Sequence, residues 1–307
     1  MIKEMLTTDE LVEYLQIHKN KIYRLIKERK LPATRITGKW LFPKQLVDEW
    51  VIDSAKAAVD SGEQKPEALG NRVVIAGSND LALELLTKSA QMQSPDLTIS
   101  LSNTGSLAGL FALRRGTCHI AAAHLLDTET GEYNSSYIKK KFPDLKVQVV
   151  NLAHREQGLL LRKGNPLGIK NLQDLVNKKA VVINRQEGSG TRVLLDFKLK
   201  ESKIDPLEIP GYATTAPAYT HLEVAVAILR GAADAGIGIR AAAKLLDLDF
   251  IPVATERFDL VIPKEHCSSK AIGALFKSLN SDELKTHMTH MGGYGMQETG
   301  KVMYEAG

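Results

Sequence analysis

The first fifty residues carry two helical patterns followed by an alternating one. Thr7 and Glu10 have capping-box spacing, and the apolar residues after them predict a helix that begins near Thr8. After a short turn, residues 19–30 place apolar side chains on one face and basic side chains on the other, which predicts a second helix. The Leu31-Pro32 pair ends this helix, because the residue before a proline disfavours helical geometry. Two short helices joined by a tight turn predict a helix-turn-helix.

An alternating pattern follows the second helix. Residues 35–42 alternate around Gly38, which predicts an antiparallel hairpin with the glycine in its turn. Pro43 and the apolar residues of 45–51 then predict a third helix that covers the core of this head. Residues 52–60 could prolong that helix.

A polar segment rich in turn-forming residues, 61–67, separates the head from the rest of the chain. The expected division is a head at 1–55, a linker at 56–69 and a body at 70–307. At 307 residues the chain is long enough for two or three folding units.

Short apolar strands alternate with helices throughout the body, which predicts an α/β fold with a mostly parallel sheet. Four strand-to-helix junctions carry small hydroxyl or amide residues, at 77–80, 102–106, 185–190 and 220–223. Helix N-termini leave backbone N–H groups unpaired and attract anions. Because such turns meet at the carboxyl ends of the strands in an open α/β sheet, we expect one shared anion site.

Two segments of the body, 154–163 and 255–264, resemble each other, and each follows an apolar strand. We expect them to be paired crossings between two lobes. Lobe 1 is expected at about 70–150 and 252–307, and lobe 2 at about 151–251.

Hydroxyl, amide and guanidinium side chains at the junctions are the candidate anion ligands, and glycines there let the backbone approach a ligand. The candidates are Ser78, Asn79, Thr104, Gly105, Ser106, His124, Ser189, Gly190, Thr191 and Arg192. For the hydroxyl residues the alternative is a helix cap that never meets a ligand. For His124 it is a satisfied core histidine, and for Arg192 it is an ion pair with Glu187 or Glu223.

Positive charge is concentrated in the head. Between Gln16 and Leu46 nine basic residues oppose one acidic residue, a surplus of +8 in a chain whose net charge is +4. Such a basic patch is typical of a module that neutralises DNA phosphates, although a basic helical hairpin used for protein contact is the alternative. The candidate DNA contacts are Lys19, Asn20, Lys21, Tyr23, Arg24 and Lys27 on the second helix, with Lys39 and Trp40 on the hairpin.

The composition favours a cytoplasmic protein. The start, MIKEMLTTDE, lacks a secretory apolar run, and no segment approaches the roughly 20 apolar residues of a membrane helix. Cys118 and Cys267 are the only cysteines, which suits a reducing compartment and argues against a disulfide framework or a thiolate zinc site. His287 and His290 are three residues apart on a predicted helix, but a solvated face is favoured over a metal site.

Motifs of several large enzyme and nucleotide-binding classes are missing from the sequence. Neither Gly-x-Gly-x-x-Gly nor a Walker loop occurs, which disfavours a dinucleotide or a nucleoside triphosphate as ligand. There is no Gly-x-Ser-x-Gly elbow, His-Glu-x-x-His pair or kinase set. We therefore expect no catalytic residues, no metal and no cofactor besides the anion.

Several positions of the head match one known pattern: Leu15 with Ile17, Tyr23 to Ile26, Leu31-Pro32, Gly38 to Trp40, and Trp50. Through them the head resembles the excisionase-type and MerR-like winged helix-turn-helix family. The sequence departs from that pattern where Gln16, His18 and Arg29 replace its usual glycine, serine and glycine. The resemblance implies a small α+β winged helix-turn-helix that binds double-stranded DNA.

Motifs spread over the body match a second family: residues 103–107, 124–134, 151–158, 184–192 and 233–240. The body resembles the type 2 periplasmic-binding-protein fold, and specifically the PBP-like domain of bacterial regulators and some molybdopterin-biosynthesis proteins. The resemblance implies an α/β bilobal body that holds an oxyanion such as molybdate or tungstate between its lobes.

Together the two parts predict a cytoplasmic one-component transcription regulator whose body closes on a small anionic effector. A single head offers one recognition helix and one wing, so we expect a homodimer on two DNA half-sites. Two alternatives use the same parts: an enzyme or carrier of molybdenum-cofactor metabolism, and a recombination accessory protein.

Overall fold

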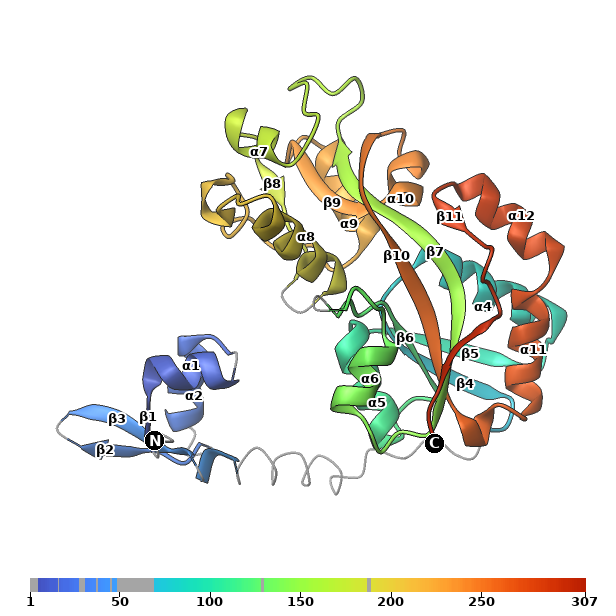
Figure 1. The fold of residues 1–307 in the computed structure, drawn as a ribbon, viewed down its shortest axis with the longest axis horizontal. Coiled ribbons are helices and arrows are strands. Elements are labelled where there is room, and N and C mark those ends of the chain that lie inside the picture. Colours follow the sequence, from blue (N-terminus) through green and yellow to red (C-terminus); the bar gives the residue numbers. More distant parts are fainter. Residues whose placement is uncertain are drawn as a thin grey trace. The chain divides into compact units, whose positions relative to one another are not determined.

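The computed structural model describes residues 5–15, 17–27, 31–36, 38–44, 46–48, 69–127, 130–186 and 189–307. The chain divides into two compact units, residues 1–64 and 65–307 (Figure 1). The expected extension of the third helix and nearly all of the expected linker lie outside the described residues.

The head contains the predicted helices and hairpin. Its elements are β1 (Met5–Thr7), α1 (Thr8–Leu15), α2 (Lys19–Lys27), β2 (Thr34–Ile36) and β3 (Lys39–Pro43). The capping box is confirmed, since the Thr7 amide donates to the Glu10 carboxylate at 2.9 Å and the Glu10 amide donates to the Thr7 hydroxyl at 3.4 Å. Of the predicted third helix the structure describes residues 46–48 as helical.

One strand of the head was not predicted. β1 pairs antiparallel with β3, which also pairs with β2, so the hairpin belongs to a three-stranded sheet. β1 has three residues, too few for an alternating pattern to show. Gly38 stands in the hairpin turn with φ +83°, a conformation that favours glycine. The buried core of the head consists of Leu6, Leu11, Ile22, Leu31, Phe42 and Val47.

The body alternates strands and helices, as expected. Its elements are β4 (Arg72–Gly77), α4 (Leu81–Gln93), β5 (Thr98–Asn103), α5 (Ser106–Arg115), β6 (Ile120–Ala123), α6 (Ser135–Lys141), β7 (Val147–Leu161), α7 (Gln173–Asn177), β8 (Val182–Ile183), α8 (Gly190–Glu201), η1 (Pro206–Glu208), α9 (His221–Leu229), β9 (Ala235–Ile239), α10 (Arg240–Leu245), β10 (Asp249–Pro263), η2 (Lys264–His266), α11 (Lys270–Leu279), α12 (Asp282–Met291), β11 (Tyr294–Gly295) and β12 (Val302–Glu305).

The expectation of a mostly parallel sheet is wrong. The strand order is β5-β4-β6-β10-β7-β9-β8, with β11 and β12 pairing β7. Within the described part of the body only the pairs β4–β5, β4–β6 and β8–β9 are parallel. The other pairs all involve β7 or β10, which run antiparallel to each other and to their neighbours.

β7 and β10 are the long strands of the body, each of fifteen residues, or about 50 Å at the usual rise. They lie side by side along the body, with α4, α5 and α11 near one end and α8, α9 and α10 near the other (Figure 1). Each end has its own apolar core, and Leu152 and Leu160 of β7 belong to different ones. The two resembling segments, 154–163 and 255–264, lie along these strands and connect the two ends.

The structure also bears on two features of the sequence, its lack of a long apolar segment and its two cysteines. Within the described ranges no helix is both long and apolar enough to cross a membrane. Cys118 is buried, Cys267 is half-buried, and both are free thiols.

Candidate functional site

The strand-to-helix turns of the body meet at a small enclosed cavity. Its lining comprises Gly77, Ser78, Asn79, Asn103, Gly105, His124, Arg185, Gln186, Ser189, Tyr219 and His221. These residues come from the turns that follow β4, β5, β6 and β8 and from the start of α9. The cavity has a volume of about 10 Å³, which is about the space of one water molecule.

Half of the predicted ligand residues line this cavity: Ser78, Asn79, Gly105, His124 and Ser189. Ser189 also caps α8, since its hydroxyl accepts from the Arg192 amide at 3.2 Å. Ser189 can therefore cap α8 and still line the candidate ligand site.

The other half do not line the cavity: Thr104, Ser106, Gly190, Thr191 and Arg192. The Ser106 hydroxyl is 2.7 Å from that of Ser78, and it accepts from the His124 amide at 3.1 Å, so it braces the cavity wall. The Thr191 hydroxyl accepts from the side-chain Nε2 of Gln157 at 3.0 Å. Contact of these residues with a ligand stays a prediction.

Arg192 lies behind the cavity wall. Its Nη1 donates to the Arg185 carbonyl at 3.3 Å, its guanidinium stacks 5.1 Å from the Tyr212 ring, and its Nε is 4.0 Å from Asp196. The expected alternative partner Glu187 lies outside the described residues.

Arg185 is the cavity cation that the sequence reasoning missed. Its side chain is 5% exposed and donates to the carbonyls of Ala218 at 3.2 Å and Tyr219 at 2.9 Å. No carboxylate of the described residues lies within ion-pair distance of it, so its described hydrogen-bond partners are neutral. Burial, and then repulsion from Arg155, lower the pKa of Arg185 to about 10, so it stays charged near neutral pH.

His221, at the start of α9, was also missed. Arg185 Nη1 lies 3.2 Å from His221 Nδ1. Because a guanidinium can only donate, Nδ1 must accept, and we assign the proton of the neutral ring to Nε2. Burial first, and then the charge of Arg185, lower the pKa of His221 well below its usual value. This imidazole therefore offers the cavity a neutral N–H donor.

His124 faces a carboxylate behind the cavity. Its Nδ1 lies 3.0 Å from Glu256 Oε2, and its side chain is 4% exposed. Burial alone would raise the pKa of Glu256, but the charge of Arg155 and the bonds from His124 and Gln157 outweigh it and lower the pKa to about 2. Burial is also the largest influence on His124, whose pKa it lowers.

A buried polar network supports this wall. Arg155 Nη1 is 2.5 Å from Asp80 Oδ2, Arg155 Nε binds Glu256, and the guanidinium lies 4.3 Å from the Phe258 ring. Gln157 Nε2 donates to Glu256 Oε1 at 2.6 Å. The network links the start of α4 to β7 and β10. Through Glu256 it fixes the His124 imidazole on the side that faces away from the cavity.

Gly190, at the start of α8, packs directly against His124. A Cβ added there would lie 2.5 Å from His124 Cε1, a distance that real Cβ atoms essentially never show. The sequence suggested that this glycine lets the backbone approach a ligand. In the structure it lets α8 approach the imidazole, and this contact joins the two ends of the body.

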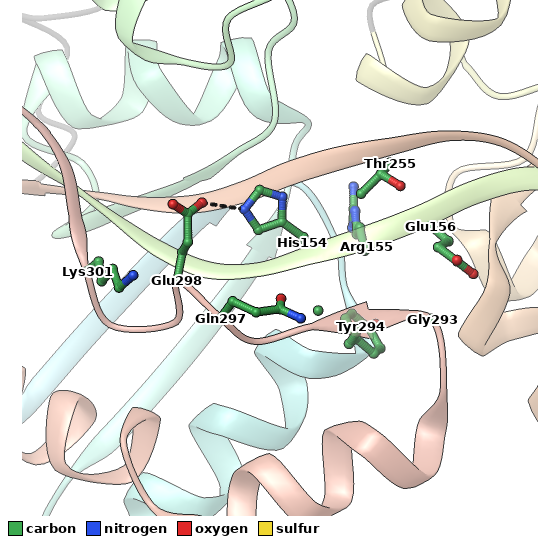
Figure 2. A pocket seen from close by; sticks show the side chains of 10 residues that line it. His154, Arg155, Glu156, Thr255, Gly293, Tyr294, Gln297, Glu298 and Lys301 are labelled. Atoms are coloured by element: carbon green, nitrogen blue, oxygen red, sulfur yellow. Dashed lines mark hydrogen bonds and ion pairs between the residues drawn. The ribbon is translucent and has the colours of Figure 1, made fainter.

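A wider hollow of about 700 Å³ lies along β7 and the C-terminal segment (Figure 2). In it His154 Nε2 lies 2.6 Å from Glu298 Oε2, with Gln297 and Lys301 nearby. Glu156, which forms an ion pair with Arg240, also contributes to the lining. Because its surface mixes both charges and is open, it fits an anion less well than the enclosed cavity does.

On the head, most candidate DNA contacts are exposed. Asn20, Lys21, Arg24 and Lys39 are exposed, and so is Tyr23. Lys19 Nζ lies 2.6 Å from Asp9 Oδ1, an exposed ion pair of the kind that contributes little to stability.

Two further DNA candidates differ from the rest. Trp40 is half-buried, packs on the core of the head, and lies 5.8 Å below the Arg35 guanidinium. The side chain of Lys27 lies outside the described residues.

The two histidines that the sequence places three residues apart both lie on α12. His287 and His290 are exposed on this helix. In the parts of the chain that the structure describes, no group of three or more His, Cys, Asp or Glu side chains is placed to hold a metal ion.

An α/β body with a mixed sheet, closed around a cavity at converging helix N-termini, defines a ligand-binding domain of the periplasmic-binding-protein class. Residues 87–280 match the PBP superfamily domain, and residues 5–52 match a helix-turn-helix domain. The chain therefore belongs to the PBP-like family, with a helix-turn-helix domain ahead of its binding domain.

One relative in sequence and two solved structures are similar to this chain. The chain is 32% identical over 305 residues to the uncharacterized protein YvgK of Bacillus subtilis, covering 97% of each chain. The tungstate ABC transporter protein of Geobacter sulfurreducens has a TM-score of 0.52 at 15% identity, over 71% of this chain and 98% of that one. A putative phosphate ABC transporter substrate-binding protein of Clostridium perfringens, solved with phosphate, has a TM-score of 0.53 at 15% identity, over 73% and 98%. These two likenesses show the fold alone.

Proposed function

We propose that the protein is a ligand-responsive transcription regulator whose body binds a small oxyanion. The observation that carries the proposal is Arg185, a buried guanidinium that lines the cavity with no described carboxylate within ion-pair distance. Burying an unpaired charge is unfavourable, and protein sites retain such a group where a ligand supplies the opposite charge. The cation therefore points to an anionic ligand.

The rest of the cavity lining suits an oxyanion. None of its described residues is acidic, and Ser78, Asn79, Ser189 and His221 offer neutral donors around Arg185. Helix N-termini at the same place favour negative charge further. Molybdate and tungstate are the first candidates, because the fold is shared with a tungstate transport protein and the ligand must be small.

Entry of such a ligand requires the cavity to open. A tetrahedral oxyanion has several heavy atoms and needs more space than one water molecule. Ser78 and His124 come from one end of the body, and Arg185, Ser189 and His221 come from the other. We place the hinge in β7 and β10, the long strands that connect the ends, where β10 has register shifts between residues 252 and 254 and between 258 and 259. The body would then act as two lobes that close on the anion.

The head supplies the output of this switch. We assign α2, with its exposed basic face, as the recognition helix. We assign the hairpin of β2 and β3 as a wing that contacts the DNA backbone. A homodimer in the cytoplasm, with two heads on two half-sites, would give specific binding. Closure of the body alters DNA affinity only if the anion binds the open and closed forms differently.

Calorimetry of the full chain with molybdate, tungstate, sulfate and phosphate tests the ligand. We expect saturable binding of at least one of these anions, with one site per chain. Absence of heat with all four, together with no change in thermal unfolding, would overturn the anion proposal.

DNA binding is tested separately. A selection from random duplex DNA should recover a sequence with two related half-sites, and the preferred anion should change its affinity in a gel shift. Recovery of no specific sequence would overturn the regulator proposal while leaving the anion site standing.

A further inference from the structure

His124 differs from the hydrogen-bond donors around the cavity, because its imidazole can offer an acceptor nitrogen or, when protonated, a donor. The residue follows β6, its backbone amide is held by the Ser106 hydroxyl at 3.1 Å, and its ring lines the cavity. Its Nδ1 lies 3.0 Å from Glu256 Oε2. The bond to Ser106 therefore fixes the main chain at His124, and the contact with Glu256 fixes the orientation of the imidazole.

The partner of Nδ1 decides where the ring proton lies. Glu256 accepts from Arg155 Nε and from Gln157 Nε2, and these bonds hold it as an ionised carboxylate. An ionised carboxylate only accepts, so Nδ1 must carry a hydrogen. Nε2 has no hydrogen-bond partner among the described residues, and in the neutral ring it is an acceptor.

His221 cannot take this role. Its Nδ1 already accepts from Arg185, so a second proton on that ring would meet the guanidinium. Of the two cavity histidines, only His124 can gain a proton without breaking a bond that the structure shows.

We propose that the cavity takes up its oxyanion together with one proton, which is shared between the anion and His124 Nε2. This proposal rests on the proposed oxyanion site and deepens it. A bare Nε2 lone pair repels the oxygen of a fully deprotonated anion, whereas a proton between the two atoms makes a hydrogen bond. With hydrogenphosphate the O–H of the ligand donates to Nε2. With tungstate, molybdate or sulfate, the imidazole gains a proton from solvent and Nε2–H donates.

Several charged or titratable groups act on the His124 ring. Glu256 on β10 favours the charged imidazole. Burial, Arg155 on β7 and Arg185 after β8 disfavour it. His221 on α9 lies on the cavity side of the ring. Burial has the largest influence and lowers the pKa of His124. A bound dianion adds negative charge on the cavity side, where the described lining residues are neutral apart from the Arg185 cation. Binding should therefore raise the affinity of the ring for a proton.

The test is calorimetry of the full chain with tungstate, from about pH 6 to about pH 9, in buffers that differ in ionisation enthalpy. Above the pKa of the free imidazole, about one proton should be taken up per tungstate bound, and Kd should rise by up to about tenfold per pH unit. Inorganic phosphate, which is mostly hydrogenphosphate at about pH 8, should bind there with no net proton uptake.

Two variants separate His124 from the rest of the chain. His124→Gln places a non-titrating amide near Nε2, and we expect tungstate binding whose Kd no longer changes with pH. His287→Gln, at an exposed position on α12, should retain the wild-type profile. The wild-type proton count needs no variant, so it decides the question even if His124→Gln fails to fold.

The outcomes are distinct. Tungstate binding with zero proton uptake at every pH, or a His124→Gln profile equal to that of wild type, would overturn the shared proton and leave the anion site standing. Absence of binding by tungstate, molybdate, sulfate and phosphate at every pH would overturn the anion site, and the shared proton with it.

Discussion

Replacing Arg185 by methionine separates a binding role from a structural one. Burial, and then repulsion from Arg155, lower the pKa of this guanidinium from 12.5 to about 10, and at about 1.4 kcal/mol per pKa unit the charged form is destabilised by about 3 kcal/mol. The folded pKa lies below the unfolded one, so this penalty is present at every pH below about 10. The Ala218 carbonyl that Arg185 would leave still accepts from the Gln186 amide at 3.1 Å. The Tyr219 carbonyl and His221 Nδ1 lose this donor, at a cost of about 1–3 kcal/mol for each acceptor that stays buried, so the two effects largely offset. Arg185→Met should therefore change the free energy of unfolding by no more than about 3 kcal/mol in either direction.

The same substitution should strongly reduce stabilisation by the anion. A charge-assisted hydrogen bond contributes about 1.5–3 kcal/mol, so loss of the guanidinium should weaken binding by at least about tenfold and more if two bonds form. At a tungstate concentration about 100 times the wild-type Kd, wild type gains about 2.7 kcal/mol and the variant should gain much less.

Urea unfolding with and without tungstate measures both effects. Arg230→Met is the comparison variant, because Arg230 is exposed at the end of α9 that lies away from the cavity, and its loss should leave the stabilisation intact. Equal stabilisation of wild type and Arg185→Met by tungstate would refute the role assigned to Arg185. A loss of several kcal/mol without the anion would show a structural role instead.

Three further predictions concern the head, the helix contact and pH. Arg24→Ala should weaken DNA binding by about 1–3 kcal/mol in a gel shift without lowering the thermal midpoint; unchanged affinity contradicts the assignment of α2. Gly190→Ala should weaken tungstate binding, whereas Gly273→Ala, whose methyl group meets nothing within 4 Å, should not; equal calorimetric affinities contradict the packing argument. Because the folded pKa of His221 lies below the unfolded one, stability is complete above about pH 6.5 and falls in more acidic solution; a constant urea midpoint between about pH 7 and pH 5 contradicts a buried neutral ring.

Local features were predicted well because neighbouring residues determine them. The capping box of Thr7 and Glu10 is confirmed, and so is the hairpin turn at Gly38. Each depends on a few residues in sequence and on the preferences of one turn or strand.

Sheet direction and the cavity cation could not be predicted in this way. Glu256 of β10 pairs with Arg155 of β7, a partner about a hundred residues away, and no local pattern indicates which way the two strands run. Arg185 was passed over for Arg192, which stands in the first turn of a helix where a ligand-binding arginine is expected. What distinguishes Arg185 is burial without a described carboxylate partner, and burial follows from tertiary packing.

Arg185, which has no carboxylate partner among the described residues, also explains how the anion could drive closure. Arg185 and His221 stand at one end of the body and Ser78 and His124 at the other, so an anion is enclosed by both sets only when the two ends are together. The penalty of about 3 kcal/mol on the charged guanidinium arises first from burial and then from repulsion by Arg155. An anion that offsets this penalty stabilises the closed form and has no comparable effect on an open one, where water solvates the charge. A difference of that size shifts the ratio of closed to open forms by about 150-fold, enough to turn a mostly open body into a mostly closed one.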